Sequence, residues 1–185
     1  MTRIPSADRL ISIDLLVLDC DGVLTDRGLL YDESGNRLLR FDARDGFGLA
    51  LFTRHSGRKA AILSGRPTDV AKHRFAELGL NPIRGRSKDK AKDVLEICTE
   101  LGISPENTAF LGDDLPDLPA MAKVGVAIAV ADAAPEVKAV TDWHLQASGG
   151  HGAVREVCET ILKATGQWQS WLAKTGFEAS RFKDL

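Results

Sequence analysis

Four short runs of apolar residues recur along the chain without polar alternation, and each is bounded by Gly, Asp or Ser. The runs span residues 15–18, 60–63, 108–111 and 124–130. Unalternating runs of this length are typical of strands that are buried on both faces. Segments with helical periodicity separate them, and we expect helices over residues 46–55, 68–78, 89–101, 115–123 and 153–164. This alternation predicts an α/β fold, a Rossmann-like three-layer sandwich with a central parallel sheet.

Polar residues follow three of the apolar runs at the point where each predicted strand ends. They are Asp19 and Asp21, then Ser64, Gly65 and Arg66, then Gly112, Asp113 and Asp114. Active and binding sites of open parallel sheets lie outside the carboxyl ends of the strands, so we expect these residues to lie together at that edge of the sheet. An isolated D-x-D-G could be a helix cap or a turn. The combined pattern favours a functional site.

The spacing of Asp19 and Asp21 predicts a metal site, because residues i and i+2 of an extended segment point to the same side. Two neighbouring carboxylates disfavour joint ionisation unless a cation lies between them. Mg²⁺ prefers oxygen ligands, and we expect Asp19, the backbone carbonyl of Asp21 and Asp113 to hold it. Asp19 can then attack phosphorus as a nucleophile. The free carboxyl group of Asp21 can donate a proton to the leaving group and later accept one from water.

The second polar segment is suited to phosphate binding. The Ser64 hydroxyl and the Gly65 backbone N–H can bind a phosphoryl oxygen, and Pro67 fits the first turn of a following helix whose N-terminus favours anions. A transferring phosphoryl group also needs a nearby positive charge. The residues alone leave Lys88, Lys90 and Lys92 open as its source.

Composition limits the classes of partner. The 185 residues are 44% apolar and 27% charged, as expected for one globular domain, and the net charge is only −2. No long Lys/Arg block suggests a nucleic-acid partner, so we expect a small-molecule substrate. Residues 11–18 are too short for a membrane span or secretion signal. Three cysteines at no metal-like spacing indicate reduced thiols in the cytoplasm, and Cys20 should point away from the two aspartates.

The motifs D-C-D-G-V-L-T at 19–25, S-G-R at 64–66 and G-D-D-L-P-D at 112–117 resemble those of the haloacid dehalogenase superfamily of aspartate-nucleophile phosphatases. With R-D-G-F-G at 44–48 and G-G-H-G-A-V-R-E-V-C at 149–158, the chain resembles the 3-deoxy-D-manno-octulosonate 8-phosphate phosphatases over roughly residues 13–162. The resemblance implies Mg²⁺-dependent hydrolysis of that sugar phosphate through an aspartyl-phosphate, a step in lipopolysaccharide precursor synthesis. It places the motif lysine on Lys90 and adds Arg66 and His151 as substrate-binding residues. The supporting residues that it implies are Thr25, Asp45, Asp114 and Asp117.

One departure from the family pattern bears on the substrate. Similar proteins usually carry Arg where this chain has His151, and His is only partly charged near neutral pH. Arg66 favours the octulosonate type over nonulosonate 9-phosphate phosphatases. A phosphatase for nonulosonate 9-phosphate or another sugar phosphate, and a non-catalytic interaction module that keeps the fold, are the alternatives.

Residues 27–41 predict a β-hairpin, because Leu29-Leu30-Tyr31 and Leu38-Leu39 flank the turn-forming segment D-E-S-G-N. The resemblance implies a capless homotetramer in which a neighbour's hairpin helps to close the site; a hairpin folded onto its own domain is the alternative. We expect one phosphatase domain over residues 8–165 and a C-terminal tail over 166–185. The tail either packs on its own core or reaches a neighbouring active site. Its aromatic residues are Trp168, Trp171, Phe177 and Phe182.

Overall fold

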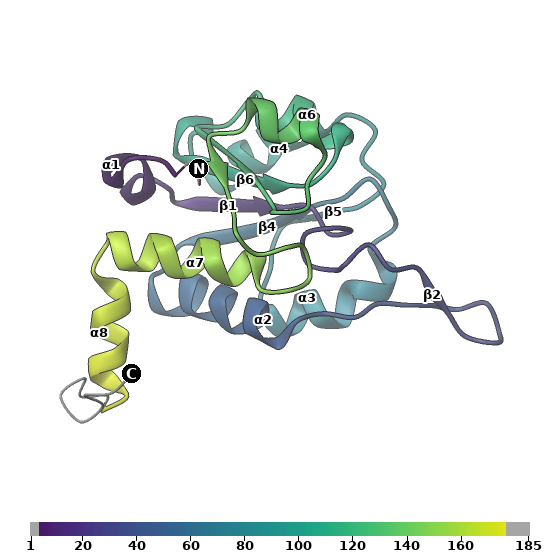
Figure 1. Ribbon diagram of the computed structural model, residues 1–185, viewed down its shortest axis with the longest axis horizontal. Helices are drawn as coiled ribbons and strands as arrows, with labels where there is room; N and C mark the ends of the chain where they lie inside the picture. Colours follow the sequence, from purple (N-terminus) through teal and green to yellow (C-terminus); the bar gives the residue numbers. More distant parts are fainter. Residues whose placement is uncertain (1–3, 177–185) are drawn as a thin grey trace.

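The centre of the molecule is a six-stranded sheet with all strands parallel, in the order β5-β4-β1-β6-β7-β8 (Figure 1). The structure is a computed structural model that describes residues 4–176. Phe177 and Phe182 of the predicted tail lie outside the described residues. The strands are β1 (Leu15–Leu18), β4 (Lys59–Leu63), β5 (Ile83–Arg84), β6 (Thr108–Gly112), β7 (Val126–Ala129) and β8 (Trp143–His144).

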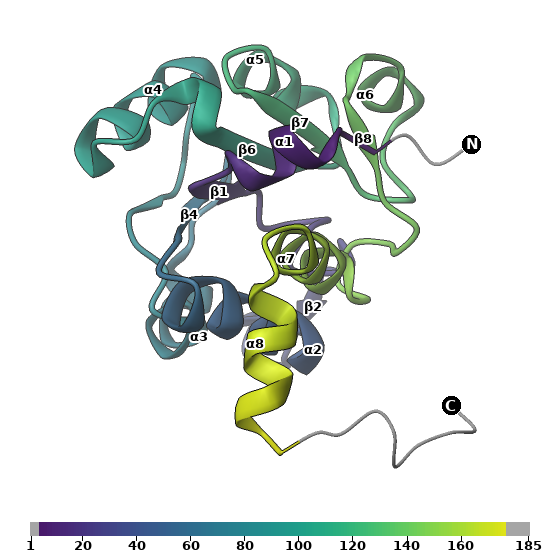
Figure 2. The same ribbon diagram turned by 90° about the vertical axis from the view of Figure 1, so that its left-hand side faces the viewer.

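Helices cover both faces of this sheet, which confirms the predicted three-layer sandwich (Figure 2). One face carries α2 (Ala43–Ala50), α3 (Lys72–Leu78) and α7 (Ala153–Ala164). The other face carries α4 (Lys90–Leu101), α5 (Leu118–Met121) and α6 (Pro135–Val140). A π-helical segment, Leu51–His55, continues α2, and short 3₁₀ turns span Asp69–Ala71, Pro105–Asn107 and Leu115–Asp117.

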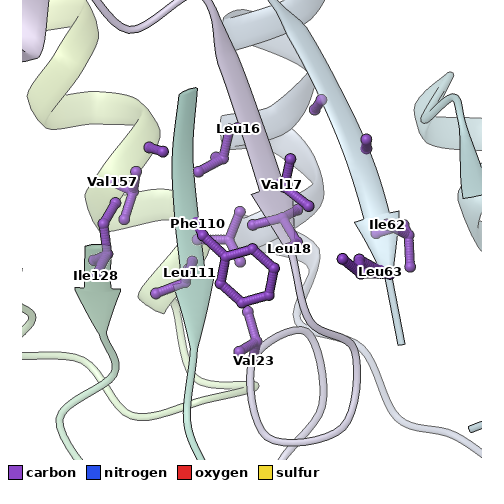
Figure 3. Close-up of a cluster of buried hydrophobic side chains, with 14 of the residues drawn as sticks. Leu16, Val17, Leu18, Val23, Ile62, Leu63, Phe110, Leu111, Ile128 and Val157 are labelled. Carbon is purple, nitrogen blue, oxygen red and sulfur yellow. The ribbon is translucent and has the colours of Figure 1, made fainter. Parts of the chain in front are cut away.

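The core forms where the two helical layers meet the sheet. All four residues of β1 are fully buried, since alternate side chains enter the two opposite layers. Phe110 and Leu111 of β6 extend the same packing, with Val157 of α7 on one side (Figure 3). Complete burial of the central strands explains why their sequences lack polar alternation.

The structure adds short elements that the apolar pattern did not predict. The edge strands β5 and β8 have two residues each, too few to show a period. The helices α1 (Ala7–Ile11) and α6 are also short, with five and six residues. Helix α2 begins earlier than expected because the Asp42 side chain accepts a hydrogen bond from the Arg44 backbone N–H and caps it.

The predicted hairpin is confirmed. Strands β2 (Leu30–Tyr31) and β3 (Arg37–Leu38) pair antiparallel and extend away from the sandwich, beyond the carboxyl ends of the strands (Figure 1). Leu30, Tyr31 and Leu38 are 52%, 59% and 51% exposed. Helix α8 (Gln167–Lys174) lies at the opposite end of the molecule (Figures 1 and 2). Across residues 4–176, no helix combines the length and apolar character that a bilayer span requires.

Candidate active site

A cavity of about 260 Å³ lies at the carboxyl edge of the sheet, between the loops that follow β1, β4 and β6. It brings together most residues that the motifs predict. The first two loops contribute Asp19, Asp21, Ser64, Gly65 and Arg66. The third loop and the start of α4 contribute Lys90, Asp113, Asp114 and Asp117.

The loop after β1 is fixed mainly by its own backbone. The carbonyl of Cys20 accepts hydrogen bonds from the backbone N–H groups of Leu24 and Thr25, and the Thr25 hydroxyl also donates to it at 3.3 Å. Gly22 adopts a φ of 106°, and a side chain there would overlap the carboxylate of Asp113. This tight loop explains why Thr25 is buried and how Asp19 and Asp21 are presented to the cavity.

Lys90 links two of the buried carboxylates. Its Nζ atom lies 2.6 Å from Asp19 Oδ1 and 2.6 Å from Asp117 Oδ1. Burial alone would lower the pKa of Lys90, but the two carboxylates outweigh burial and raise it. Lys88 is exposed, so Lys90 is the candidate that the structure places beside Asp19.

Asp117 fixes the loop after β6. Its second oxygen accepts hydrogen bonds from the backbone N–H groups of Asp113 at 2.9 Å and Asp114 at 3.3 Å. Asp114 itself accepts from the N–H of Leu115 and caps the following 3₁₀ turn. Asp117 therefore connects Lys90 to the loop that carries Asp113.

The buried carboxylates fit a divalent cation. Asp19, Asp113 and Asp117 each offer an oxygen within 4.8 Å of the others, and hard oxygen ligands suit Mg²⁺. Burial, followed by the charge of Asp117, raises the pKa of Asp19 to about 7 against the opposing effect of Lys90. Burial also raises the pKa of Asp113 to about 6. A cation would remove this penalty on the ionised forms.

The members of this cluster differ in how free they are to bind metal. Lys90 and two backbone N–H groups already engage Asp117. The side chain of Asp21 lies outside the cluster and pairs with Arg37 and Arg66 instead. The burial of Cys20 raises the pKa of its thiol, and its side chain does not line the cavity.

The phosphate-binding segment differs from the prediction in one respect. The Ser64 hydroxyl is buried and accepts a hydrogen bond from the Arg66 N–H at 3.1 Å, so its own proton is free for a ligand. The helix expected over residues 68–78 is α-helical only in its second part, however. A 3₁₀ turn spans Asp69–Ala71 and α3 begins at Lys72, so no α-helix directly follows Pro67.

Two arginines that the sequence analysis did not assign reach the catalytic edge. Arg27 Nε lies 2.7 Å from Asp113 Oδ2, and its terminal nitrogens bind Asp132. Arg37, on β3, forms an ion pair with Asp21. Arg66 approaches the other oxygen of Asp21 at 3.6 Å. Arg27 could have been predicted from the sequence, because it lies directly after the first motif. Arg37 could not, because it is distant in sequence from each motif.

His151 and Asp45 lie outside the residues that line the cavity. His151 Nδ1 is 2.8 Å from the carbonyl oxygen of Gly149, and Nε2 is 3.3 Å from Arg40. Asp45 accepts hydrogen bonds from the N–H groups of Gly152 and Arg155, so it caps the start of α7. Burial raises the pKa of Asp45. Asp45 therefore supports the fold rather than contacting the cavity.

Comparisons with known proteins agree with this geometry. Residues 43–125 match the family model for haloacid dehalogenase-like hydrolases. A 3-deoxy-D-manno-octulosonate 8-phosphate phosphatase from Escherichia coli is 41% identical over 84% of this chain and 82% of its own length. The phosphatase of the same name from Haemophilus influenzae is 37% identical over 91% of this chain and 93% of its length.

A solved structure extends the similarity to the fold. The 3-deoxy-D-manno-octulosonate 8-phosphate phosphatase from Moraxella catarrhalis, solved with a magnesium ion, a phosphate ion and a KDO molecule, superposes with a TM-score of 0.87 at 36% identity. The match covers 91% of this chain and 97% of that one. The chain belongs to the haloacid dehalogenase-like hydrolases, within the family of 3-deoxy-D-manno-octulosonate 8-phosphate phosphatases.

Proposed function

We propose that this protein is a Mg²⁺-dependent phosphomonoesterase that hydrolyses 3-deoxy-D-manno-octulosonate 8-phosphate to the sugar acid and phosphate, a cytoplasmic step in lipopolysaccharide precursor synthesis. The observation that carries the proposal is the buried Asp19, which lies 2.6 Å from Lys90 and shares a carboxylate cluster with Asp113. Relatives 37–41% identical over most of the chain bear the name of this activity.

The first step transfers the phosphoryl group to the protein. An oxygen of Asp19 forms a bond to phosphorus, and the bond from phosphorus to the sugar oxygen breaks. Asp21 in its protonated form gives its proton to the departing alkoxide, which requires its ion pair with Arg37 to open when the substrate binds. Lys90, the Ser64 hydroxyl and the Gly65 N–H stabilise the phosphoryl oxygens. Asp19, the backbone carbonyl of Asp21 and Asp113 would hold Mg²⁺, which when bound neutralises repulsion between the nucleophile and the phosphate dianion.

The second step regenerates Asp19. Asp21, now ionised, takes a proton from a water molecule as that water attacks the phosphorus of the aspartyl-phosphate. The bond between phosphorus and Asp19 breaks, and inorganic phosphate leaves. Because the carboxyl group of Asp21 is outside the metal cluster, it can serve in both steps.

A panel of sugar phosphates tests this function. The purified protein with Mg²⁺ should show its highest kcat/KM on the octulosonate ester, and the Asp19→Asn variant should release no phosphate. A higher kcat/KM on a nonulosonate 9-phosphate or another sugar phosphate would mean that this other ester is the substrate. If no ester were hydrolysed and Asp19→Asn changed nothing, the protein would be a non-catalytic module.

We further propose a homotetramer in which the hairpin of each chain packs against a neighbour. A two-stranded ribbon is only marginally stable alone, and this one exposes Leu30, Tyr31 and Leu38. Replacing Leu30 and Leu38 by Asp should convert the tetramer to smaller species in analytical ultracentrifugation. A double variant that stayed tetrameric would show that assembly does not use the hairpin.

A further inference from the structure

Arg37 is a hairpin residue that does not itself line the cavity but pairs with Asp21, which does. It lies on β3, 16 residues after Asp21, and its guanidinium pairs with the Asp21 carboxylate. Both side chains are mostly buried, with exposed fractions of 15% and 17%. The Arg37 side chain is therefore much less exposed than Leu30, Tyr31 and Leu38 of the same hairpin.

The Arg37 guanidinium has unused hydrogen-bonding capacity. Its Nε atom is buried and has no partner among residues 4–176. An arginine has five N–H donors in a planar fork, and an unpaired buried donor is unfavourable. Arg66 Nε lies 3.6 Å from the other oxygen of Asp21. Two guanidiniums thus share one carboxylate, which leaves local positive charge that a second anion can neutralise.

The proposed reaction determines which part of the substrate meets this pair. Asp21 acts on the sugar oxygen that leaves phosphorus, so the sugar lies on the Asp21 side of the phosphoryl group. Ser64 and Lys90 hold the phosphoryl group from the other loops. The sugar acid carries one more anion, a carboxylate, and the planar fork of arginine is suited to bind a carboxylate through two parallel hydrogen bonds.

His151 is poorly placed for the same task. Its Nδ1 atom faces a backbone carbonyl and its Nε2 atom faces Arg40, so neither ring nitrogen is directed to the cavity as a free donor. On this basis, and resting on the proposed function, we propose that Arg37 is a specificity-determining residue whose guanidinium binds the carboxylate of the sugar acid, beside Arg66.

The test compares an ester that has the carboxylate with one that lacks it. The kcat/KM values for 3-deoxy-D-manno-octulosonate 8-phosphate and ribose 5-phosphate are measured for the wild type, Arg37→Met and Arg37→Lys. Arg37→Met should lower the ratio of kcat/KM for the octulosonate ester to kcat/KM for ribose 5-phosphate by about tenfold or more, mainly by raising KM for the octulosonate ester. This is the loss expected for one charge-assisted hydrogen-bonding group. Arg37→Lys should restore only part of this ratio, since an ammonium group cannot form the bidentate contact.

Inhibition by the two products gives a second readout. Free 3-deoxy-D-manno-octulosonate should inhibit Arg37→Met about tenfold more weakly than the wild type, while inhibition by inorganic phosphate should change less than about threefold. Arg40→Met is the matched control, because Arg40 belongs to the same hairpin but contacts Asp26 and His151 instead of Asp21. It should change the ratio of kcat/KM values by less than about threefold.

Two results would overturn the inference. An equal fall in kcat/KM for both esters would mean that Arg37 acts only through Asp21, and an unchanged ratio would mean that it does not contact the sugar acid. Circular dichroism and a thermal melt of each variant identify misfolding. If the wild type itself preferred a carboxylate-free ester, the proposed function would fail, and that outcome is visible before any variant is made.

Discussion

Replacing Asp19 by Asn should stabilise the metal-free protein at neutral and alkaline pH, although it removes the proposed nucleophile. Burial, followed by the charge of Asp117, raises the pKa of Asp19 from its ordinary value of 3.8 to about 7, against the effect of Lys90. Between these values the unfolded chain has lost the proton and the folded protein still holds it. The favourable contribution of the neutral carboxyl is fully present below about pH 4 and is lost as the pH rises to about 7.

The size of the effect follows from the same pKa. The difference between 3.8 and about 7 amounts to about 4 kcal/mol, at about 1.36 kcal/mol for each pKa unit. An amide at position 19 has no proton to lose, so its contribution does not change with pH. Lys90 keeps Asp117 as a counter-ion in the variant. The stability of Asp19→Asn relative to the wild type should therefore rise by about 4 kcal/mol between about pH 4 and pH 8.

Urea unfolding in the presence of EDTA measures this difference directly. Both proteins are unfolded at several pH values, and the difference in the free energy of unfolding is plotted against pH. The control is Asp114→Asn, which removes an exposed carboxylate from the same edge of the sheet. Adding Mg²⁺ at about pH 8 should then stabilise the wild type more than Asp19→Asn, because a ligand stabilises the state that binds it.

A difference between Asp19→Asn and the wild type that stayed constant with pH would refute this reasoning. It would mean that the folded protein already compensates the ionised Asp19 without metal, through Lys90 alone. The carboxylate cluster would then give no reason for a bound cation. Equal stabilisation of the two proteins by Mg²⁺ would place the ion away from Asp19.

Three further predictions concern other residues of the site. Asp21→Asn should lower kcat by about a hundredfold or more, since it removes the acid and base of both steps; its Mg²⁺ affinity by calorimetry should be unchanged. Lys90→Met should cost about 3–5 kcal/mol in urea unfolding at about pH 8, because it leaves two buried carboxylates unpaired; an equally stable variant would contradict this. Gly149→Ala should lower the melting temperature, because its Cβ would overlap the Gly22 carbonyl oxygen, and an unchanged melt would exclude that overlap.

The sheet and the clustering of the candidate residues could be predicted from the sequence for the same physical reason. Strands buried on both faces have continuous apolar runs, and each parallel strand delivers the residues after it to one edge. Leu15–Leu18 and Thr108–Gly112 are neighbours in register, so Asp19 and Asp113 must lie close together once the strands are recognised. Residue patterns alone did not separate Lys90 from Lys88; the family resemblance favoured Lys90, and the structure places it 2.6 Å from Asp19.

The residues around this edge were harder to predict. Arg37 reaches Asp21 through the orientation of a hairpin that pairs over only two residues per strand, and its sequence has no pattern that fixes that orientation. The ring orientation of His151 depends on a backbone carbonyl two residues away and on Arg40. The helix after Ser64 was predicted too early, because Pro67 is as compatible with an extended loop as with a first helical turn.

Different parts of the fold carry the carboxylates of the proposed reaction and the arginines proposed to select the substrate. The carboxylates of the proposed reaction are held by strands and by hydrogen bonds from the backbone, such as those from Asp113 and Asp114 to Asp117. The arginines beside them come from loops and the hairpin, where substitutions do not disturb the core. A change at Arg37 can therefore alter the anion that the cavity selects while Asp19 and Lys90 keep their geometry. The proposed phosphoryl transfer thus depends on the sheet, and the proposed substrate selection depends on the loops and the hairpin around its carboxyl edge.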